Sequence, residues 1–368
     1  MAVRYVRVDP IVNLFAPATR AFGTIAVVGR TSSTAAVIAK PVLFTNPDDA
    51  KDAFPGELGT AIELAFLQTP GPELVFGVPV ASTAPDWAAG LDAVAALNVQ
   101  LVLLANVPVT DTTKADGGPI HLLSDHVTSV SNTGADGSER MGVAMLEKGE
   151  TDPGVILPNE RMVYIAHNST QDAAAAVAGT IAGYEPSVSL LLKPVNITSP
   201  PFKPADIETL NGPQPETAKT GPTGAGVNWL TTPALIPGNG VFMGEGYTGD
   251  SSHGKKYIDV VRFTDDVAFQ LKARLINSIG NVRITRSGLR TLIAQLEAVL
   301  TPLLEADVLT GFEVVVPLLA LLDKDPATRT AEETQRIHDA EVARLVQVLA
   351  ALQYAGAVHR ISISLKFD

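Results

Sequence analysis

Short apolar segments and amphipathic segments alternate through the first half of the chain, and this order limits the fold more than any other feature. Strands are expected over residues 23–29, 41–45, 73–79, 99–105, 141–146 and 162–166. Helices are expected over residues 47–54, 57–68, 85–97, 120–131 and 171–183, with Asn46 as the N-cap of the first. Such alternation is typical of a largely parallel, doubly wound sheet. The sequence therefore predicts an α/β domain over residues 21–192.

The rest of the chain has a different character. Seven prolines within residues 193–226 indicate an extended crossing segment, not a packed element, and this segment is expected to run over 193–254. The elements expected after it are a strand over 256–263, a helix over 264–279 capped by Thr264-Asp265-Asp266, a helix from Thr285 or Ser287 to Leu304, a strand over 311–316 and a long amphipathic helix over 330–354. This mixture predicts an α+β domain with a small sheet over residues 255–368.

Both ends of the chain have the pattern of a β-strand. At the start, within an arm expected over 1–20, residues 2–9 are rich in strand formers, namely Val3, Tyr5, Val6 and Val8. At the other end, residues 358–367 alternate strictly, with Ile361, Ile363, Leu365 and Phe367 on one face. A terminal strand must pair with something, and an open sheet edge is a template for another chain. We therefore expect these eight residues to form strands between subunits.

Composition excludes several classes of protein. The 368 residues include no cysteine, which rules out disulfides, iron–sulfur clusters and thiol catalysis. The net charge of −12 argues against a general nucleic-acid binder. No apolar run approaches the length that spans a bilayer, and the first residues lack the apolar core of a signal peptide. No membrane insertion is expected.

The motifs that suggest catalysis are incomplete. Residues 249–256 match the first seven positions of a phosphate-binding P-loop, but Lys256 stands where Ser or Thr should hold magnesium, and a strand is expected next. His121 and His126 are five residues apart, a spacing that makes them diverge on a helix, and His167 has no catalytic partner in the sequence. We predict no catalytic residue, metal ligand or cofactor. An α/β nucleotide-binding protein or enzyme stays open as an alternative.

One charged region stands out. Residues 267–296 contain no Asp or Glu but hold five cations, Lys272, Arg274, Arg283, Arg286 and Arg290. These residues fit a solvated helix–turn–helix or, equally well, a basic face turned to an acidic partner.

The order and spacing of these elements resemble contractile tail sheath proteins. The resemblance rests on Gly23–Gly29, Pro41–Thr45, the helix with Ala61, Ile62 and Phe66, the 256–262 segment, Gly311–Val314 and the ending Ala355–Ile363. It implies a structural protein without enzymatic activity or cofactor, built from an outer α/β domain, an inner C-terminal domain and terminal strand arms.

The resemblance also implies how such a chain assembles. Sheath subunits form stacked hexameric rings around an inner tail tube, held together by terminal strands added to neighbouring sheets. On triggering they contract and drive the tube through a target envelope.

The implied partners are further copies of the chain, the tube protein, and baseplate and tail terminator proteins, without direct contact with nucleic acid. The five cations become candidates for facing the tube. The implied location is a virion tail or an extracellular contractile particle (phage, bacteriocin or injection system), assembled in the host cytoplasm. Another tail component, such as a sheath initiator, stays open, and the long helix over 330–354 is larger than a compact sheath needs.

Overall fold

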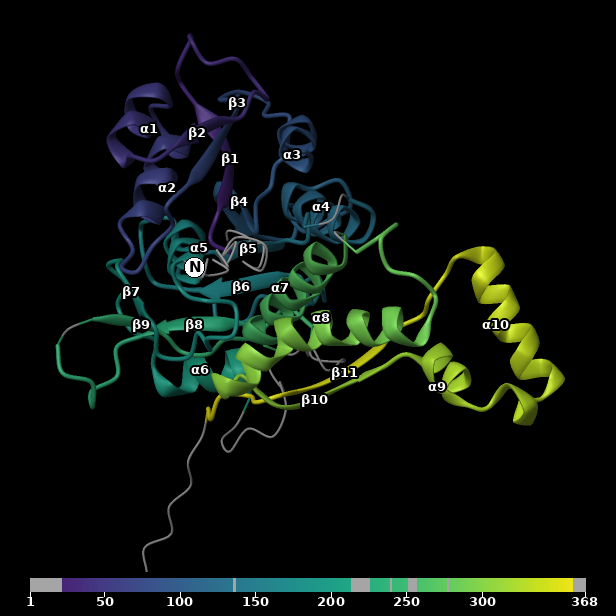
Figure 1. The fold of residues 1–368 in the computed structure, drawn as a ribbon. Coiled ribbons are helices and arrows are strands. Elements are labelled where there is room, and N and C mark those ends of the chain that lie inside the picture. The colour runs from purple at the N-terminus through teal and green to yellow at the C-terminus, as the bar shows by residue number, and fades with distance from the viewer. Residues whose placement is uncertain are drawn as a thin grey trace, which may run out of the picture. The chain divides into compact units, whose positions relative to one another are not determined.

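A computed structural model describes residues 22–134, 137–212, 226–238, 240–250, 257–276 and 278–359 (Figure 1). Within these residues the chain forms two compact units, a larger one over 22–266 with 357–359 and a smaller one over 267–356. The residues predicted to form inter-subunit strands, 3–8 and 361–367, lie outside the described residues. Val358 and His359 are described, and they belong to no strand.

The larger unit is built on one nine-stranded sheet, which confirms the predicted α/β class. Its strands are β1 (Ile25–Thr31), β2 (Val42–Phe44), β3 (Val75–Ala81), β4 (Leu101–Val109), β5 (Met141–Leu146), β6 (Met162–Ala166), β7 (Pro194–Val195), β8 (Asn228–Thr231) and β9 (Val241–Met243), in the order β2-β3-β1-β4-β5-β6-β8-β9-β7. The central pairs from β3 to β8 are parallel, whereas β2, β9 and β7 join by antiparallel pairs.

Helices cover both faces of this sheet. They are α1 (Pro47–Ala53), α2 (Glu57–Phe66), α3 (Trp87–Ala95), α4 (Pro119–Thr133), α5 (Ala173–Gly183) and α6 (Pro204–Asn211). Ile25 and Val27 of β1 pack in one core with α2 and α5. Ala26 and Val28 pack in the other core with α3, α4 and α6. Figure 1 shows α2 and α3 on opposite sides of β1. Because successive side chains of a strand face opposite ways, β1 is apolar at every one of these positions.

The alanine-rich helix α5 is closely packed inside the larger unit. Every residue from Ala173 to Ala182 is buried, so this helix is enclosed on all sides. At Gly179 a Cβ atom would meet the Ala65 backbone oxygen at 2.3 Å, so α5 lies directly against α2. Larger side chains on α5 would force these two helices apart. Small residues therefore permit a closely packed core that has few aromatic residues.

The smaller unit contains helices and a two-stranded antiparallel sheet. Its elements are the second half of α7 (Ile258–Ile276), α8 (Arg286–Glu305), β10 (Leu309–Val315), α9 (Pro317–Asp323), the 3₁₀ helix η2 (Pro326–Thr328), α10 (Ala331–Ala343) and β11 (Leu349–Tyr354). Thr285 caps α8, since its hydroxyl accepts the Gly288 N–H at 3.1 Å. In the described part of the chain, no helix combines the length and apolarity needed to cross a membrane.

The strand predicted over 256–263 is wrong, because residues from Ile258 onward belong to α7, and the expected cap at Thr264-Asp265-Asp266 falls inside that helix. The buried positions Ile258, Val261, Arg262 and Asp265 are spaced as one helical face. Two of these four residues, Arg262 and Asp265, are charged. The buried face therefore lacks the regular apolar spacing from which a helix is predicted in a sequence. Arg161 closes this face with a bidentate ion pair to Asp265, at 2.8 and 2.9 Å.

The prediction of an unpacked crossing segment over 193–226 is also wrong for its first part. β7 joins the sheet, and α6 buries Leu210 completely in the core shared with α3 and α4. Pro204 occupies the first turn of α6, where a proline lacks no needed hydrogen bond, and the Asp206 carboxylate accepts the Lys203 N–H at 3.0 Å. A proline that was taken to exclude structure instead starts a helix. Residues 213–225 lie outside the described ranges.

The long helix predicted over 330–354 is a shorter helix followed by a strand. The predicted capping box is present, since Thr330 accepts the Glu333 N–H at 3.1 Å and Glu333 accepts the Thr330 N–H at 3.1 Å. α10 then ends at Ala343, because Arg344 adopts a left-handed conformation with φ of 52°. Residues 349–354 form β11 on β10. The element that made this chain look too large for a compact sheath is therefore partly a strand of the small sheet.

Candidate functional site

The two-stranded ladder of β10 and β11 is the first candidate site. Its antiparallel register pairs Phe312 with Leu352 and Val315 with Leu349, with an irregularity between Leu309 and Gly311. Figure 1 shows the two strands side by side, with α9 and α10 in the connection between them. In that connection Leu318 of α9 and Ile337 of α10 are buried in one cluster with α8. The connection is therefore a small packed body and not a loose loop.

Each strand of this ladder has an open edge. Among the described residues, no further strand pairs with β10 or β11. The side chains are also poorly covered, with Val315 38% and its partner Leu349 51% exposed. An isolated two-stranded ladder is marginally stable in water, and its unpaired N–H and C=O groups can accept further strands. The arrangement is suited to strand addition.

The five basic residues of the sequence separate into two sets. Arg286 and Arg290 of α8 bind the carboxyl end of α9: Arg286 Nε donates to the Leu322 carbonyl at 2.6 Å, and Arg290 Nη2 lies 3.2 Å from Asp323 Oδ1. Lys272 and Arg274 are on α7, and Arg283 lies in the turn before α8, where it is exposed. Arg286 and Arg290 thus contribute to packing within the smaller unit, although both stay at least half exposed.

The carboxyl ends of β1 and β4, the edge where open α/β sheets bind ligands, carry polar groups that hydrogen-bond to one another within the chain. Asp172 caps α5 by accepting the Ala175 N–H at 2.9 Å, and it also accepts the Asn106 N–H at 2.7 Å. Burial raises the pKa of Asp172. The Asn106 amide donates to Glu57 at 3.2 Å, and Glu57 lies 3.7 Å from Arg30. These polar groups are engaged with one another, which weakens the enzyme alternative.

The histidines that the sequence singled out have structural partners. His167 is buried, its Nε2 bonded to the Leu146 carbonyl at 3.1 Å and its Nδ1 accepting the Ser169 N–H at 3.2 Å, and burial lowers its pKa. His121 pairs with Asp125 on the α4 surface, while His126 points into the core, so the two diverge as expected. The described residues contain no cluster of three potential metal ligands.

The P-loop-like segment, residues 249–256, is followed by a different element from the one predicted. Residues 251–256 lie outside the described residues, and the element after them is the helix α7, not a strand. A helix therefore does follow the segment, as in a P-loop, but Lys256 still stands where Ser or Thr should hold magnesium. The first turn of α7 already carries the buried carboxylate of Asp259, which complements the positive end of the helix dipole.

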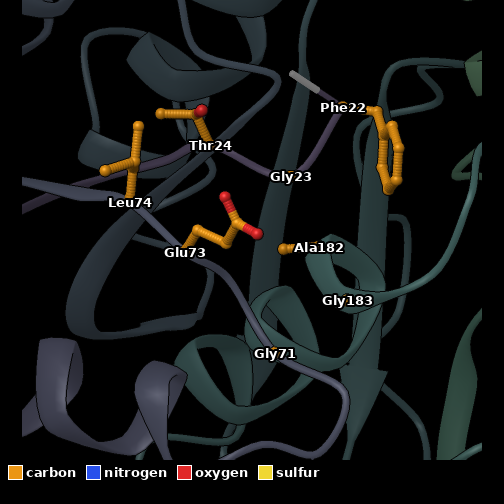
Figure 2. A pocket seen from close by; sticks show the side chains of 8 residues that line it. All are labelled: Phe22, Gly23, Thr24, Gly71, Glu73, Leu74, Ala182 and Gly183. Carbon is orange, nitrogen blue, oxygen red and sulfur yellow. The ribbon is translucent and has the colours of Figure 1, made fainter. Parts of the chain in front are cut away.

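A hollow of about 220 Å³ lies at the amino ends of β1 and β3. Figure 2 shows it bounded by Phe22, Thr24 and Leu74 from the strand ends and by Ala182 and Gly183 from the end of α5, with the Glu73 carboxylate pointing into it. Ligands of parallel sheets bind at the carboxyl ends of the strands, the opposite edge. Among the described residues that line the hollow, Glu73 is the one charged residue.

Sheath proteins are among the solved structures that share this fold. The sheath of an extracellular contractile injection system (PVC), in the contracted state, matches with a TM-score of 0.69 at 12% identity, covering 100% of this chain and 98% of that chain. The helical sheath of the anti-feeding prophage, also contracted, matches with a TM-score of 0.68 at 14% identity, covering 100% of both chains. The sheath tail protein of Listeria innocua matches with a TM-score of 0.54 at 10% identity, covering 82% of this chain and 90% of that chain.

No protein-family model matches the sequence, and no curated protein matches it. At these identities the likeness lies in the fold, and the described part of the chain has the fold of contractile sheath proteins. The resemblance inferred from the order of sequence elements is confirmed at that level.

Proposed function

We propose that this protein is a sheath subunit that polymerises as stacked hexameric rings around an inner tail tube and contracts to drive the tube through a target cell envelope. The observation that carries the proposal is the match over the whole chain to two helical sheaths. A tube protein, a sheath initiator or an α/β enzyme is less well supported, because the match covers almost the full length of both sheath chains. The proposed role is structural and needs no cofactor.

The terminal segments are the proposed links between subunits. The strands expected from Val3 to Val8 and from Ile361 to Phe367 would add to the open edges of a neighbour's β10–β11 ladder. Each backbone hydrogen bond contributes about 0.5–1.5 kcal/mol net, and burial of an apolar strand face adds about 25 cal/mol per Å². Main-chain hydrogen bonds also form whatever the side chains are. They therefore suit a link between subunits that must stay intact while the domains move. Repetition through a lattice multiplies the effect.

The two units would then differ in position within the particle. We assign the larger unit to the outside and the smaller unit to the tube side, as the resemblance to sheaths implies. Lys272, Arg274, Arg283, Arg286 and Arg290 are the proposed tube-facing cations. A chain of net charge −12 gains most from such a cluster if the partner surface is acidic. Baseplate and terminator proteins are the proposed partners at the two ends of a virion tail or extracellular particle assembled in the host cytoplasm.

Negative-stain electron microscopy of the purified full chain tests the proposal. We expect hollow tubes or stacked rings, and large assemblies in size-exclusion chromatography. A chain that stays monomeric at high concentration, with or without tube protein, would contradict it. Binding of a nucleoside triphosphate by such a monomer would favour the α/β enzyme instead.

A further inference from the structure

The last described residue, His359, is held firmly although its neighbour Val358 is 76% exposed. His359 Nδ1 lies 3.0 Å from Glu245 Oε2, and a carboxylate oxygen accepts, so this nitrogen donates. The other ring nitrogen lies 2.8 Å from the Ser189 hydroxyl, and the ring is 4.7 Å from that of Tyr257. The side chains of His359 and Glu245 are only 12% and 5% exposed. A polar residue buried beside an exposed valine indicates specific anchoring.

The groups that receive His359 are themselves fixed to the sheet. Asn228 of β8 is completely buried, and its side chain accepts the Tyr247 N–H at 2.6 Å and donates to the Tyr247 carbonyl at 2.9 Å. Tyr247 packs on Tyr257 with ring centroids 5.5 Å apart. His359 therefore rests on a continuous series of contacts, through Tyr257 and Tyr247, that leads to Asn228 in β8 of the larger unit's sheet.

The first described residue of the chain is anchored close to the same elements. Arg262 of α7 donates to the carbonyls of Tyr184 at 2.8 Å, Glu185 at 3.4 Å and Phe22 at 3.4 Å. Arg262 is buried, and burial lowers its pKa to about 10, so it stays charged at neutral pH. Its partners Tyr184 and Glu185 belong to the segment 184–190, which also contributes Ser189 to His359.

We propose that segment 184–190 and the first turns of α7 form a common anchor for both terminal segments, with His359 and Arg262 as its positioning residues. Tyr257 directly precedes α7 and contacts His359, the last described residue, while Arg262 lies in the first turns of α7 and contacts Phe22, the first described residue. The inference rests on the proposed function, because the segments it positions are the ones expected to join subunits. It concerns where each arm begins, not where the arm binds.

The physical advantage of such an anchor is pre-organisation. A strand whose root is fixed searches a smaller volume before it meets a neighbouring sheet edge, so less conformational entropy is lost on binding. Side-chain hydrogen bonds and ring contacts at the start of an arm also fix the direction in which the arm leaves the subunit when tension is applied. One anchor for both arms gives them a fixed mutual geometry within each subunit.

Distance measurements between spin labels test the role of His359 in the single subunit. The chain has no cysteine, so Val358→Cys and the exposed Ala96→Cys can carry the only two labels, at a concentration below assembly. We expect one narrow distance peak, and its loss in His359→Ala. His338→Ala, an exposed histidine on α10, is the matched control and should leave the peak unchanged. Ser189→Ala, which removes one hydrogen bond, replaces His359→Ala if that variant does not fold.

Assembly provides the second readout. Loss of the anchor should raise the subunit concentration needed for a given polymer fraction about tenfold, the effect of losing one or two hydrogen bonds. A peak that stays narrow in both His359→Ala and Ser189→Ala would overturn the proposal, and so would normal polymerisation after the peak is lost. If the parent protein forms no polymers, the proposed function fails, whereas the distance measurement still decides the anchor.

Arg262 is tested by hydrogen exchange at the start of the chain. Arg262→Lys keeps the charge but cannot reach three carbonyls with a planar fork of donors. We expect exchange of the Gly23 and Thr24 amides to rise about tenfold, as expected for the loss of one charge-assisted hydrogen bond. Lys148→Arg on the surface is the control. Unchanged exchange in a folded Arg262→Lys protein would remove Arg262 from the anchor.

Discussion

The two units of this chain bury their strands to very different degrees. Every residue of β5 and β6 in the larger unit is buried, whereas β11 in the smaller unit has no buried residue. The larger unit encloses its central strands between helices on both faces, so its folding depends on its own core. The smaller unit leaves a ladder with open edges, a state that soluble proteins usually cover or blunt.

Large exposed apolar side chains occur in both units, and some of those in the smaller unit lie in or near the ladder. The segment from Val315 to Leu349 contains four large exposed ones, namely Val315, Val342, Leu345 and Leu349. An open sheet edge flanked by apolar side chains is a surface that a partner is expected to cover. We infer that the larger unit provides most of the folding stability of the subunit, and that the smaller unit provides the surfaces by which it binds other subunits.

The strongest test of this contrast is deletion of residues 361–368. Because the His359 anchor and both cores are retained, we expect the subunit to stay folded. Polymer formation should be lost completely, since the proposed linking strand is absent. Tryptophan fluorescence reports folding, because both tryptophans, Trp87 and Trp229, lie in the larger unit. Normal tubes from the truncated chain, seen by electron microscopy, would refute the linking role.

A matched pair of leucine substitutions separates stability from association. Leu103 in β4 is 0% exposed, and Leu103→Ala should lower the free energy of unfolding by about 3 kcal/mol. Leu349 in β11 is 51% exposed, and Leu349→Ala should cost the subunit less than about 0.5 kcal/mol while weakening assembly. Urea unfolding and sedimentation of polymers measure the two effects. Equal costs at both positions would show that the two units do not differ in this way.

Acid should destabilise the larger unit through His126. Its Nε2 lies 3.3 Å from Arg140 Nη1, and burial, reinforced by the guanidinium charge, lowers the pKa of His126 from 6.5 to about 4. Between these values the unfolded chain binds a proton that the folded chain does not, so stability falls as pH falls. The loss should reach about 3 kcal/mol near pH 4 and vanish above pH 7.

Urea unfolding at a series of pH values measures this loss. His126→Gln should flatten the profile between pH 6.5 and 4, and His338→Gln should not alter it. A profile that keeps its slope in His126→Gln would assign the acid sensitivity to other groups.

Charge reversal tests the basic surface of the smaller unit. Lys272→Glu with Arg283→Glu should slow encapsulation of the tube roughly tenfold at low salt, because complementary charges act mainly on the rate of encounter. The difference should shrink as salt is added, since exposed charges are screened. Lys148→Glu with Lys193→Glu, in the larger unit, is the matched control. An equal effect of the control pair would indicate a response to net charge only.

The smallest effect is expected for the ion pairs on α9. Arg290 and Asp323 are 65% and 41% exposed, so Asp323→Asn should lower the stability of the smaller unit by less than about 1 kcal/mol. Circular dichroism at low and high salt measures the change, with the exposed Glu313→Gln as control. A loss of several kcal/mol would mean that this pair holds the α9–α10 body in place.

Elements with a local signal were predictable. The strands over 141–146 and 162–166 coincide with β5 and β6, and Asn46 caps α1 by accepting the Asp48 N–H at 3.0 Å. The hydrogen-bonded cluster of Asp172, Asn106 and Glu57 was not predicted. Its members are far apart in the sequence, and none of them belongs to a recognisable motif. The anchor at His359 was missed for the same reason, although a histidine at the start of an alternating strand was visible.

The sequence by itself determined the α/β class, most of the helix starts and the order of elements that resembles a sheath, because periodicity and capping act within a few residues. Only the tertiary structure decided that 258–276 is a helix and 349–354 a strand. Arg161 stabilises the first by pairing with Asp265, and β10 stabilises the second through a ladder to residues far earlier in the chain. Such contacts outweigh intrinsic propensities of a few tenths of a kcal/mol per residue, and no local pattern records them.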